Sequence, residues 1–149
     1  MLIGQLGIRL ILWIGQTVPT PASYDVMNAL TRVHVQTDEK EGDGFQISFT
    51  LGKDKTGSYS LLDNSALAPD SRVVIGVLIG ASLAPLIDGV IYHQQVQPSN
   101  EPGMSILTVS GRDISVMLDL EEKDEQFNNQ SDSVIVTNIL LKYAQYVTP

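Results

Sequence analysis

Two long segments of alternating apolar and polar residues near the middle of the chain most constrain its fold. They occupy residues 86–97 and 104–110, and a loop containing Pro and Gly, residues 98–103, separates them. A period of two places successive side chains on opposite faces, as in β-strands with one buried face. The short connection lets two such strands pair antiparallel. We therefore predict a long antiparallel strand pair, with a bulge or bend at Gly89 inside its first strand.

Strand patterns also precede this pair. Residues 30–37 and 45–52 alternate in the same way and are joined by the polar turn DEKEGDG, residues 38–44, which predicts a hairpin with a long loop. Residues 72–79 are rich in β-branched side chains, which favours a strand over a helix. Residues 53–70 are polar and rich in turn-forming residues, which predicts a loop.

The apolar start of the chain, MLIGQLGIRLILWIG, invites comparison with targeting and membrane segments. A signal peptide needs a positively charged segment ahead of the apolar run, and none is present. A membrane helix needs a longer run than this one, which also contains Gln5 and Arg9. We predict a buried strand instead, followed by an extended connection containing Pro19 and Pro21. One face of that strand carries Gly7, Arg9, Ile11 and Trp13, and the other carries Ile8, Leu10, Leu12 and Ile14.

The periodicity becomes helical near the C-terminus. Asp113 is a good N-cap, and apolar residues at helical spacing follow it, so we predict a short helix over residues 113–120. Ser131 or Asp132 is expected to cap a second helix over residues 131–145. An apolar stripe on the second helix contains Ile135, Val136, Ile139, Leu140 and Tyr143.

These patterns predict one domain over residues 1–149, with its main strands in residues 29–110. The fold class is β-dominated α+β, an antiparallel curved barrel or sandwich with one or two flanking helices. The formal charge of −8, with nine Lys and Arg residues in the chain, opposes specific nucleic-acid binding as a main role. The sequence contains no Cys, which excludes disulfides and thiolate chemistry.

Catalytic and metal-binding patterns are few. His34 and His93, the only histidines, lie on predicted strands where they face solvent or an interface, without an HxH or HExxH pattern. The acidic residues in 119–125 lack the spacing of a calcium loop and are expected to be a solvated helix end. No GxSxG, GxGxxG or P-loop is present. We predict a protein that is not an enzyme and that has no catalytic residue, metal or cofactor.

Two alternatives stay open. Trp13, Tyr24 and Tyr92 could line a pocket for a small ligand or a carbohydrate, in which case the protein is a binding domain. Seventeen acidic residues could place two carboxylates in one cleft, as in a small hydrolase.

Five segments, in order, resemble the N-terminal domain of the late control gene D family, the hub proteins of contractile phage tails, to which the VgrG hub of type VI secretion is similar. They are DGFQISFTLG (43–52), VVIGVLIG (73–80), LIDGVIYHQQVQ (86–97), SILTVSGRDISVMLD (105–119) and SDSVIVTNILLKYA (131–144). The upstream LILWIGQTVPTP (10–21) is similar to the opening strand and proline link of that family. The motif residues that this resemblance singles out are Asp43, Gly44, Phe45, Asp88, Gly89, Gly111, Asp113, Ser131 and Tyr143.

The resemblance implies a fold of the tail-tube and hub type and a structural role in the baseplate. Hubs of this family form trimers whose paired barrels imitate a sixfold ring, so that a hexameric tube can stack on a threefold spike. The implied partners are further copies of the chain, the tail tube protein, the spike protein and other baseplate proteins, without membrane insertion. The implied location is the tail baseplate of a virion or an injection particle, assembled in the bacterial cytoplasm.

Family members continue past the last helix into further domains, often including a second barrel, whereas this sequence ends at Pro149. A shortened chain, a fragment of a longer hub and a second barrel supplied by another chain all fit this difference. Polar residues such as Gln94, Gln95 and Gln97 are expected to serve the ring interface or to face water.

Overall fold

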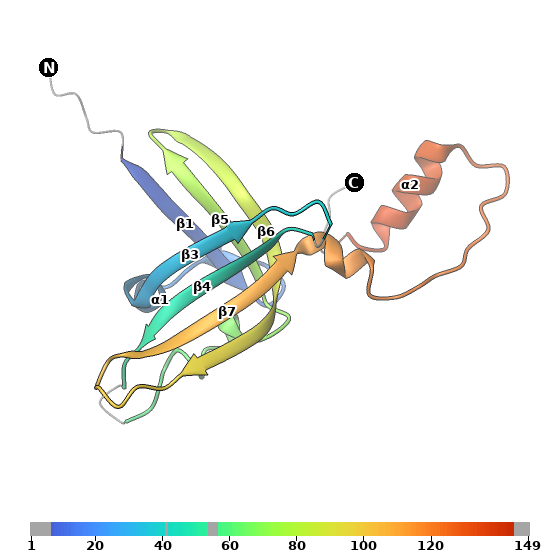
Figure 1. Ribbon diagram of the computed structural model, residues 1–149. Helices are drawn as coiled ribbons and strands as arrows, with labels where there is room; N and C mark the ends of the chain where they lie inside the picture. The colour runs from blue at the N-terminus through green and yellow to red at the C-terminus, as the bar shows by residue number, and fades with distance from the viewer. Residues whose placement is uncertain (1–6, 41, 54–56, 145–149) are drawn as a thin grey trace, which may run out of the picture. The chain divides into compact units, whose positions relative to one another are not determined.

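The computed structural model describes residues 7–40, 42–53 and 57–144. The chain divides into two compact units, Met1–Asp113, called here the β-unit, and Ile114–Pro149, called here the helical unit (Figure 1). Within the described ranges, no helix is long and apolar enough to cross a membrane.

One antiparallel sheet of seven strands, in the order β2-β1-β5-β6-β7-β4-β3, forms the β-unit. Its strands are β1 (Ile8–Gly15), β2 (Thr20–Pro21), β3 (Leu30–Gln36), β4 (Gly44–Leu51), β5 (Arg72–Ile79), β6 (Ser82–Gln97) and β7 (Ser105–Asp113). The β-dominated antiparallel fold expected from the alternating patterns is confirmed. The predicted hairpin is β3–β4, and the predicted long pair is β6–β7.

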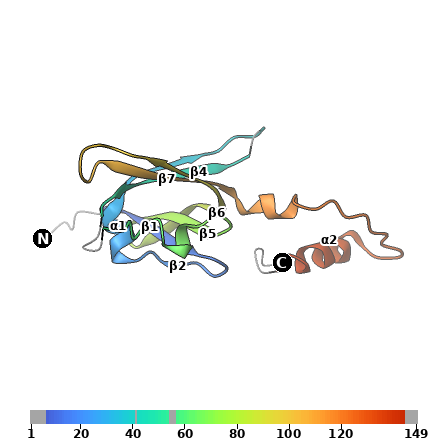
Figure 2. The ribbon, with the colours of Figure 1, turned by 90° about the horizontal axis from the view of Figure 1, so that it is seen from below.

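The sheet curls so that it forms two layers. Figure 2 shows β4 and β7 in one layer and β1 and β5 in the other. The 16-residue β6 belongs to both layers, because its first part pairs with β5 and its second part pairs with β7. The pairing register shifts twice along β6, at Leu86 and at Tyr92. A bulge or bend was expected at Gly89, and the two register shifts lie on either side of that residue. Bulges of this kind add local bending and twist to a strand.

The hydrophobic core fills the space between the layers. Alternate residues of the strands point into it, as the period of two predicts. The largest fully buried apolar side chains are Phe49, Ile47, Leu51, Leu67, Ile75, Ile91, Leu107, Val73 and Val109. From β1, Leu12 and Ile14 are buried, which confirms the predicted strand and shows that the face carrying Leu10, Leu12 and Ile14 is the inward one.

The Phe45 ring packs against two glycines, Gly89 and Gly111. It lies opposite Gly111 in the β4–β7 pair. A Cβ added to Gly111 would lie 2.0 Å from Phe45 Cζ, and one added to Gly89 would lie 2.8 Å from Phe45 Cε1. The two glycines therefore leave the space that the aromatic ring occupies, which also shields backbone that a glycine exposes.

Two short helices lie outside the predicted strands, α1 after the predicted proline connection and η1 within the predicted loop of residues 53–70. α1 (Tyr24–Ala29) begins after Ser23, whose Oγ accepts a hydrogen bond from the Val26 amide at 3.4 Å. α1 has no apolar periodicity that would predict it, because Val26 is its one buried residue. The 3₁₀ turn η1 (Ser65–Leu67) buries Leu67 and is capped by Asn64, whose Oδ1 accepts from the Ala66 amide at 3.0 Å.

The helical unit differs from prediction at its start. Asp113 ends β7, paired with Gly89 of β6, and its amide donates to the Asp43 carbonyl at 3.0 Å. Strand pairing therefore continues one residue into the predicted helix, and only a 3₁₀ helix, η2 (Ile114–Leu118), follows. α2 (Asp132–Leu141) has Ser131 at its N-cap position, although the Ser131 side chain makes no capping hydrogen bond. Residue 145 of the predicted second helix lies outside the described residues, and the single domain over residues 1–149 stays a prediction.

Replacing Gly111 with Ala tests the packing around Phe45. The new methyl group overlaps the ring and the Val90 carbonyl oxygen, 2.6 Å away, so neighbouring backbone has to move. We expect Gly111→Ala to lower the free energy of unfolding by about 2–3 kcal/mol, as overpacking does. Urea denaturation followed by circular dichroism measures the change.

The matched control is Gly52→Ala, because nothing lies within 4 Å of a Cβ at Gly52. Its effect should stay within about 0.5 kcal/mol. Equal stability of the two variants would contradict the packing described for Phe45.

Candidate assembly surface

Two neighbouring strands, β1 and β5, carry apolar residues on both of their faces. Their inward side chains, among them Leu12 and Ile75, are buried in the core. Apart from Arg9 and Arg72, their outward side chains are also apolar, and none of these apolar residues packs against the core cluster. Strands with apolar residues on both faces are typical of sheets that are covered on both sides.

The strand register places the outward residues side by side. Trp13 lies opposite Val74, and Arg9 lies opposite Leu78, which in turn lies opposite Leu83 of β6. We call the set Ile11, Trp13, Val74, Leu78 and Leu83 the outer apolar face. Leu83 is 50% exposed. A contiguous apolar surface of this kind is typical of a protein–protein contact.

An ion pair bounds the outer apolar face at one end. The Arg72 guanidinium donates to Asp88 from Nε at 2.8 Å and from Nη2 at 2.5 Å. The Arg72 side chain is 19% exposed and that of Asp88 is 34% exposed. The hydrogen bond from Arg72 to Asp88, and then the charge of Asp88, raise the pKa of Arg72 above its ordinary value, against the opposing effect of burial. The guanidinium therefore stays charged, and the bidentate geometry fixes the positions of β5 and β6.

The sheet has open strand edges. On its outer side β1 pairs with β2 only at Trp13 and Ile14, and the Leu12 carbonyl accepts from the Ala22 amide. Among the residues that the structure describes, nothing pairs with the edge of β1 between Ile8 and Ile11. β3 forms the opposite edge of the sheet. Unpaired edges of this kind can accept a strand from another chain.

The outward face of the other layer is polar. One row across four strands contains His34, Gln46, Ser110 and His93. Both histidines are exposed, as predicted from the alternation. Gln95 and Gln97 are also exposed, whereas Gln94 is partly buried and its amide donates to the Leu67 carbonyl. Gln94 therefore links η1 to β6. This contact differs from both expected roles, which were a ring interface and exposure to water.

A shallow depression of about 270 Å³ lies at the end of this polar face. Its lining includes His34, Asp43, Tyr92 and Arg112. The Arg112 guanidinium lies over the Tyr92 ring, 5.5 Å from its centroid. Neither Trp13 nor Tyr24 contributes to the lining, so this depression is not the three-aromatic pocket that a carbohydrate-binding domain was expected to have.

The residues singled out by the family resemblance fall into two groups. Most lie together where β4 begins, β7 ends and β6 crosses between the layers. This group consists of Asp43, Gly44, Phe45, Asp88, Gly89, Gly111 and Asp113. Asp43 Oδ1 accepts from the Asp38 amide at 3.2 Å and shapes the β3–β4 turn. Ser131 and Tyr143 belong to the helical unit, where Lys123 Nζ lies 5.7 Å from the centroid of the Tyr143 ring.

The described acidic residues form ion pairs but no metal-binding group. In the part of the chain that the structure describes, no three His, Asp or Glu side chains come close enough together to hold a metal ion. The acidic segment 119–125 forms exposed ion pairs, Lys123 with Glu121 at 3.0 Å and Lys142 with Glu125. The outer apolar face was not identified from the sequence, although the uninterrupted apolar character of residues 73–79 was a sign of it.

The fold is similar to that of two solved phage tail proteins. The 43 kDa tail protein of prophage MuSo2 from Shewanella oneidensis matches with a TM-score of 0.54 and 17% identity, over 93% of this chain and 38% of that chain. The tail protein from Neisseria meningitidis MC58 matches with a TM-score of 0.52 and 14% identity, over 93% of this chain and 34% of that chain. This chain therefore spans well under half the length of either protein. No protein-family model matches the sequence, and no curated protein matches it significantly.

Removing the charge of Asp88 tests the ion pair that bounds the outer apolar face. In Asp88→Asn a neutral amide replaces the carboxylate that accepts from Arg72 Nε and Nη2, so the charge-assisted bidentate contact is lost. We expect the free energy of unfolding to fall by about 1 kcal/mol, near the upper end for pairs that water still reaches.

The control is Glu121→Gln, which removes the exposed partner of Lys123. Its effect on chemical denaturation should be smaller than about 0.5 kcal/mol. A loss in the control as large as that in Asp88→Asn would show that the Arg72–Asp88 pair has no special role.

Proposed function

We propose that this protein is a structural component of a contractile phage tail or related injection machine, where it acts as a baseplate hub between the tail tube and the central spike. The observation that carries the proposal is the outer apolar face, on a fold that is similar over most of the chain to two tail proteins. An apolar sheet face that is only partly buried within one chain is stabilised when a neighbouring subunit covers it.

The energy of such a contact is substantial. Burial of apolar surface contributes roughly 25 cal/mol per Å², so covering a few hundred Å² of sheet adds several kcal/mol to association. The open edge of β1 adds backbone hydrogen bonds at the same place. When the contacting surfaces on two subunits are different, each copy can bind the next one, and the contacts close into a ring.

The segments that resemble the late control gene D and VgrG hubs support a baseplate role for this assembly. In the proposed hub the chain forms a trimer that contacts the tail tube protein, the spike protein and other baseplate proteins. Its location is the baseplate of the virion or injection particle, after assembly in the bacterial cytoplasm. The role is structural and not enzymatic, and it needs no cofactor. The formal charge of −8 favours protein partners over nucleic acid.

A charge placed on the outer apolar face should prevent assembly. For Leu83→Asp we expect the trimer, or the complex with tube and spike proteins, to dissociate to monomer, because a carboxylate would be buried in the contact. Size-exclusion chromatography with light scattering, on the chain alone and mixed with candidate tube and spike proteins, measures this change.

Gln95→Asp is the matched control, since it adds the same charge to the same strand on the polar face. It should leave the assembly intact. A wild-type chain that stays monomeric and ignores both tube and spike proteins would contradict the hub and favour a binding domain.

A further inference from the structure

Helix α2 is apolar to a degree unusual for an exposed helix. Six of its ten residues are Val, Ile or Leu, and none of the ten is buried. At 3.6 residues per turn, the predicted stripe that includes Val136, Ile139 and Tyr143 lies on one side, and Val134 lies on the opposite side. Val136 is 54% exposed and Ile139 is 40% exposed. A helix with this composition normally lies against other structure, and an isolated helix of ten residues is marginal in water.

The later part of the stripe lines a groove that the helical unit itself forms. The groove has a volume of about 330 Å³, and its apolar lining consists of Leu118, Phe127, Ile139, Leu140 and Tyr143. One wall is α2, and the other is the segment of residues 118–127. We call this feature the helical groove.

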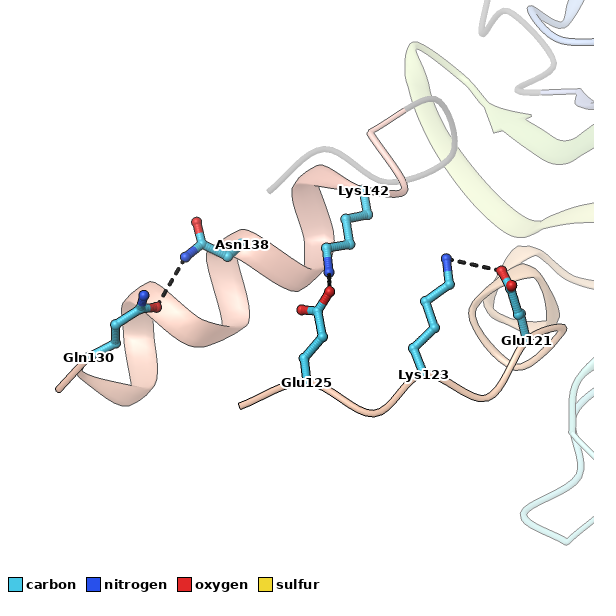
Figure 3. Close-up of polar contacts among 6 residues, drawn as sticks. All are labelled: Glu121, Lys123, Glu125, Gln130, Asn138 and Lys142. Atoms are coloured by element: carbon cyan, nitrogen blue, oxygen red, sulfur yellow. Dashed lines mark hydrogen bonds and ion pairs between the residues drawn. The ribbon is translucent and has the colours of Figure 1, made fainter. Parts of the chain in front are cut away.

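One ion pair joins the two walls of the helical groove without closing it. Lys142, the C-cap residue of α2, pairs with Glu125 on the opposite wall (Figure 3). A second polar contact joins α2 to the residue that precedes its N-cap, since Asn138 Nδ2 donates to Gln130 Oε1 at 3.2 Å (Figure 3). A groove that is already formed costs less conformational entropy to fill than one that has to be ordered on binding.

Charge at the helical groove indicates the chemistry of its occupant. Residues 114–149 contain six carboxylates and two lysines, and both lysines are already engaged, Lys123 with Glu121 and Lys142 with Glu125. Asp119, Glu122 and Asp124 belong to the segment of residues 118–127, beside the groove and outside its lining, and within the described residues no basic side chain pairs with them. A second copy of this unit, nucleic acid or an anionic membrane would bring further negative charge to these carboxylates.

We propose that the helical groove docks a partner protein through an amphipathic segment whose apolar side chains enter the groove and whose Lys or Arg side chains meet the carboxylates beside it. This contact is separate from the outer apolar face and does not depend on the hub role. The recognition mode is that of a helix placed in a groove, in which apolar residues three and four apart provide the anchors.

Synthetic peptides test the proposal on the full chain. The probe is a peptide of about 15 residues with Leu at helical spacing on one face and Lys elsewhere, a length at which helices begin to form. One control peptide has Glu in place of every Lys, and another has the composition of the probe in an order that gives no apolar face. Titrations of the ¹⁵N-labelled chain follow binding by the shifts of its amide signals.

We expect the probe to bind at least about tenfold more tightly than either control, a difference of about 1.4 kcal/mol. The shifts should fall within residues 118–143. Ile139→Asp should weaken binding about tenfold or more, whereas Val134→Asp, the same change on the opposite side of α2, should not. The double variant Glu122→Lys/Asp124→Lys leaves the helix sequence intact and should reverse the preference between the Lys and Glu peptides.

Each other outcome overturns the proposal. Equal binding of the probe and the reordered peptide would mean attraction by charge alone. No binding of the probe, or shifts confined to the sheet, would mean that the groove is not the docking site. Self-association of the chain that is lost in Ile139→Asp would make a second copy the occupant. None of these results tests Leu83 or the outer apolar face, so either proposal can be wrong while the other is right.

Discussion

The structure of the β-unit depends on one strand that serves two layers. β6 pairs with β5 in its first part and with β7 in its second part, and the register shifts at Leu86 and Tyr92 accompany the change of partner. Between them, Gly89 and the neighbouring Gly111 leave the space for the Phe45 ring. A side chain at either glycine would meet the ring or the backbone beside it. A large aromatic side chain and two residues without side chains therefore pack together where the strand changes layer.

The curl also gives the two layers different outward surfaces. In the layer of β3, β4 and β7, outward residues such as His34, Gln46 and Ser110 are polar, which suits contact with water. In the layer of β1 and β5, outward residues such as Trp13 and Val74 are apolar. Because both layers share one core, folding alone does not require this difference. An apolar outward layer costs solubility in a monomer and becomes favourable only when it is covered.

Much of this architecture could be predicted from sequence, because alternation is a local property. The bounds of β5 agree with prediction, and those of β3 and β4 agree within a residue. Interactions between distant residues account for the errors. β7 continues into the first residue of the helix predicted at 113–120, because Asp113 pairs with Gly89 and its amide donates to the Asp43 carbonyl. Asp113, although a good N-cap residue, is therefore part of a strand. Its pairing depends on residues far away in the sequence, so no local pattern predicts it.

The candidate surfaces were less predictable than the strands for a related reason. Alternation identifies which residues share a face but does not say whether a partner covers that face. The stripe of Ile135, Ile139 and Tyr143 was recognised as helical, and a stripe normally implies burial. In the structure it borders a groove that is only partly filled from within its own unit. The same holds for β1 and β5, whose outward residues have no neighbour in the core. Each unit leaves apolar residues partly exposed, and each of the two proposals explains one of these sets by its own contact with another protein.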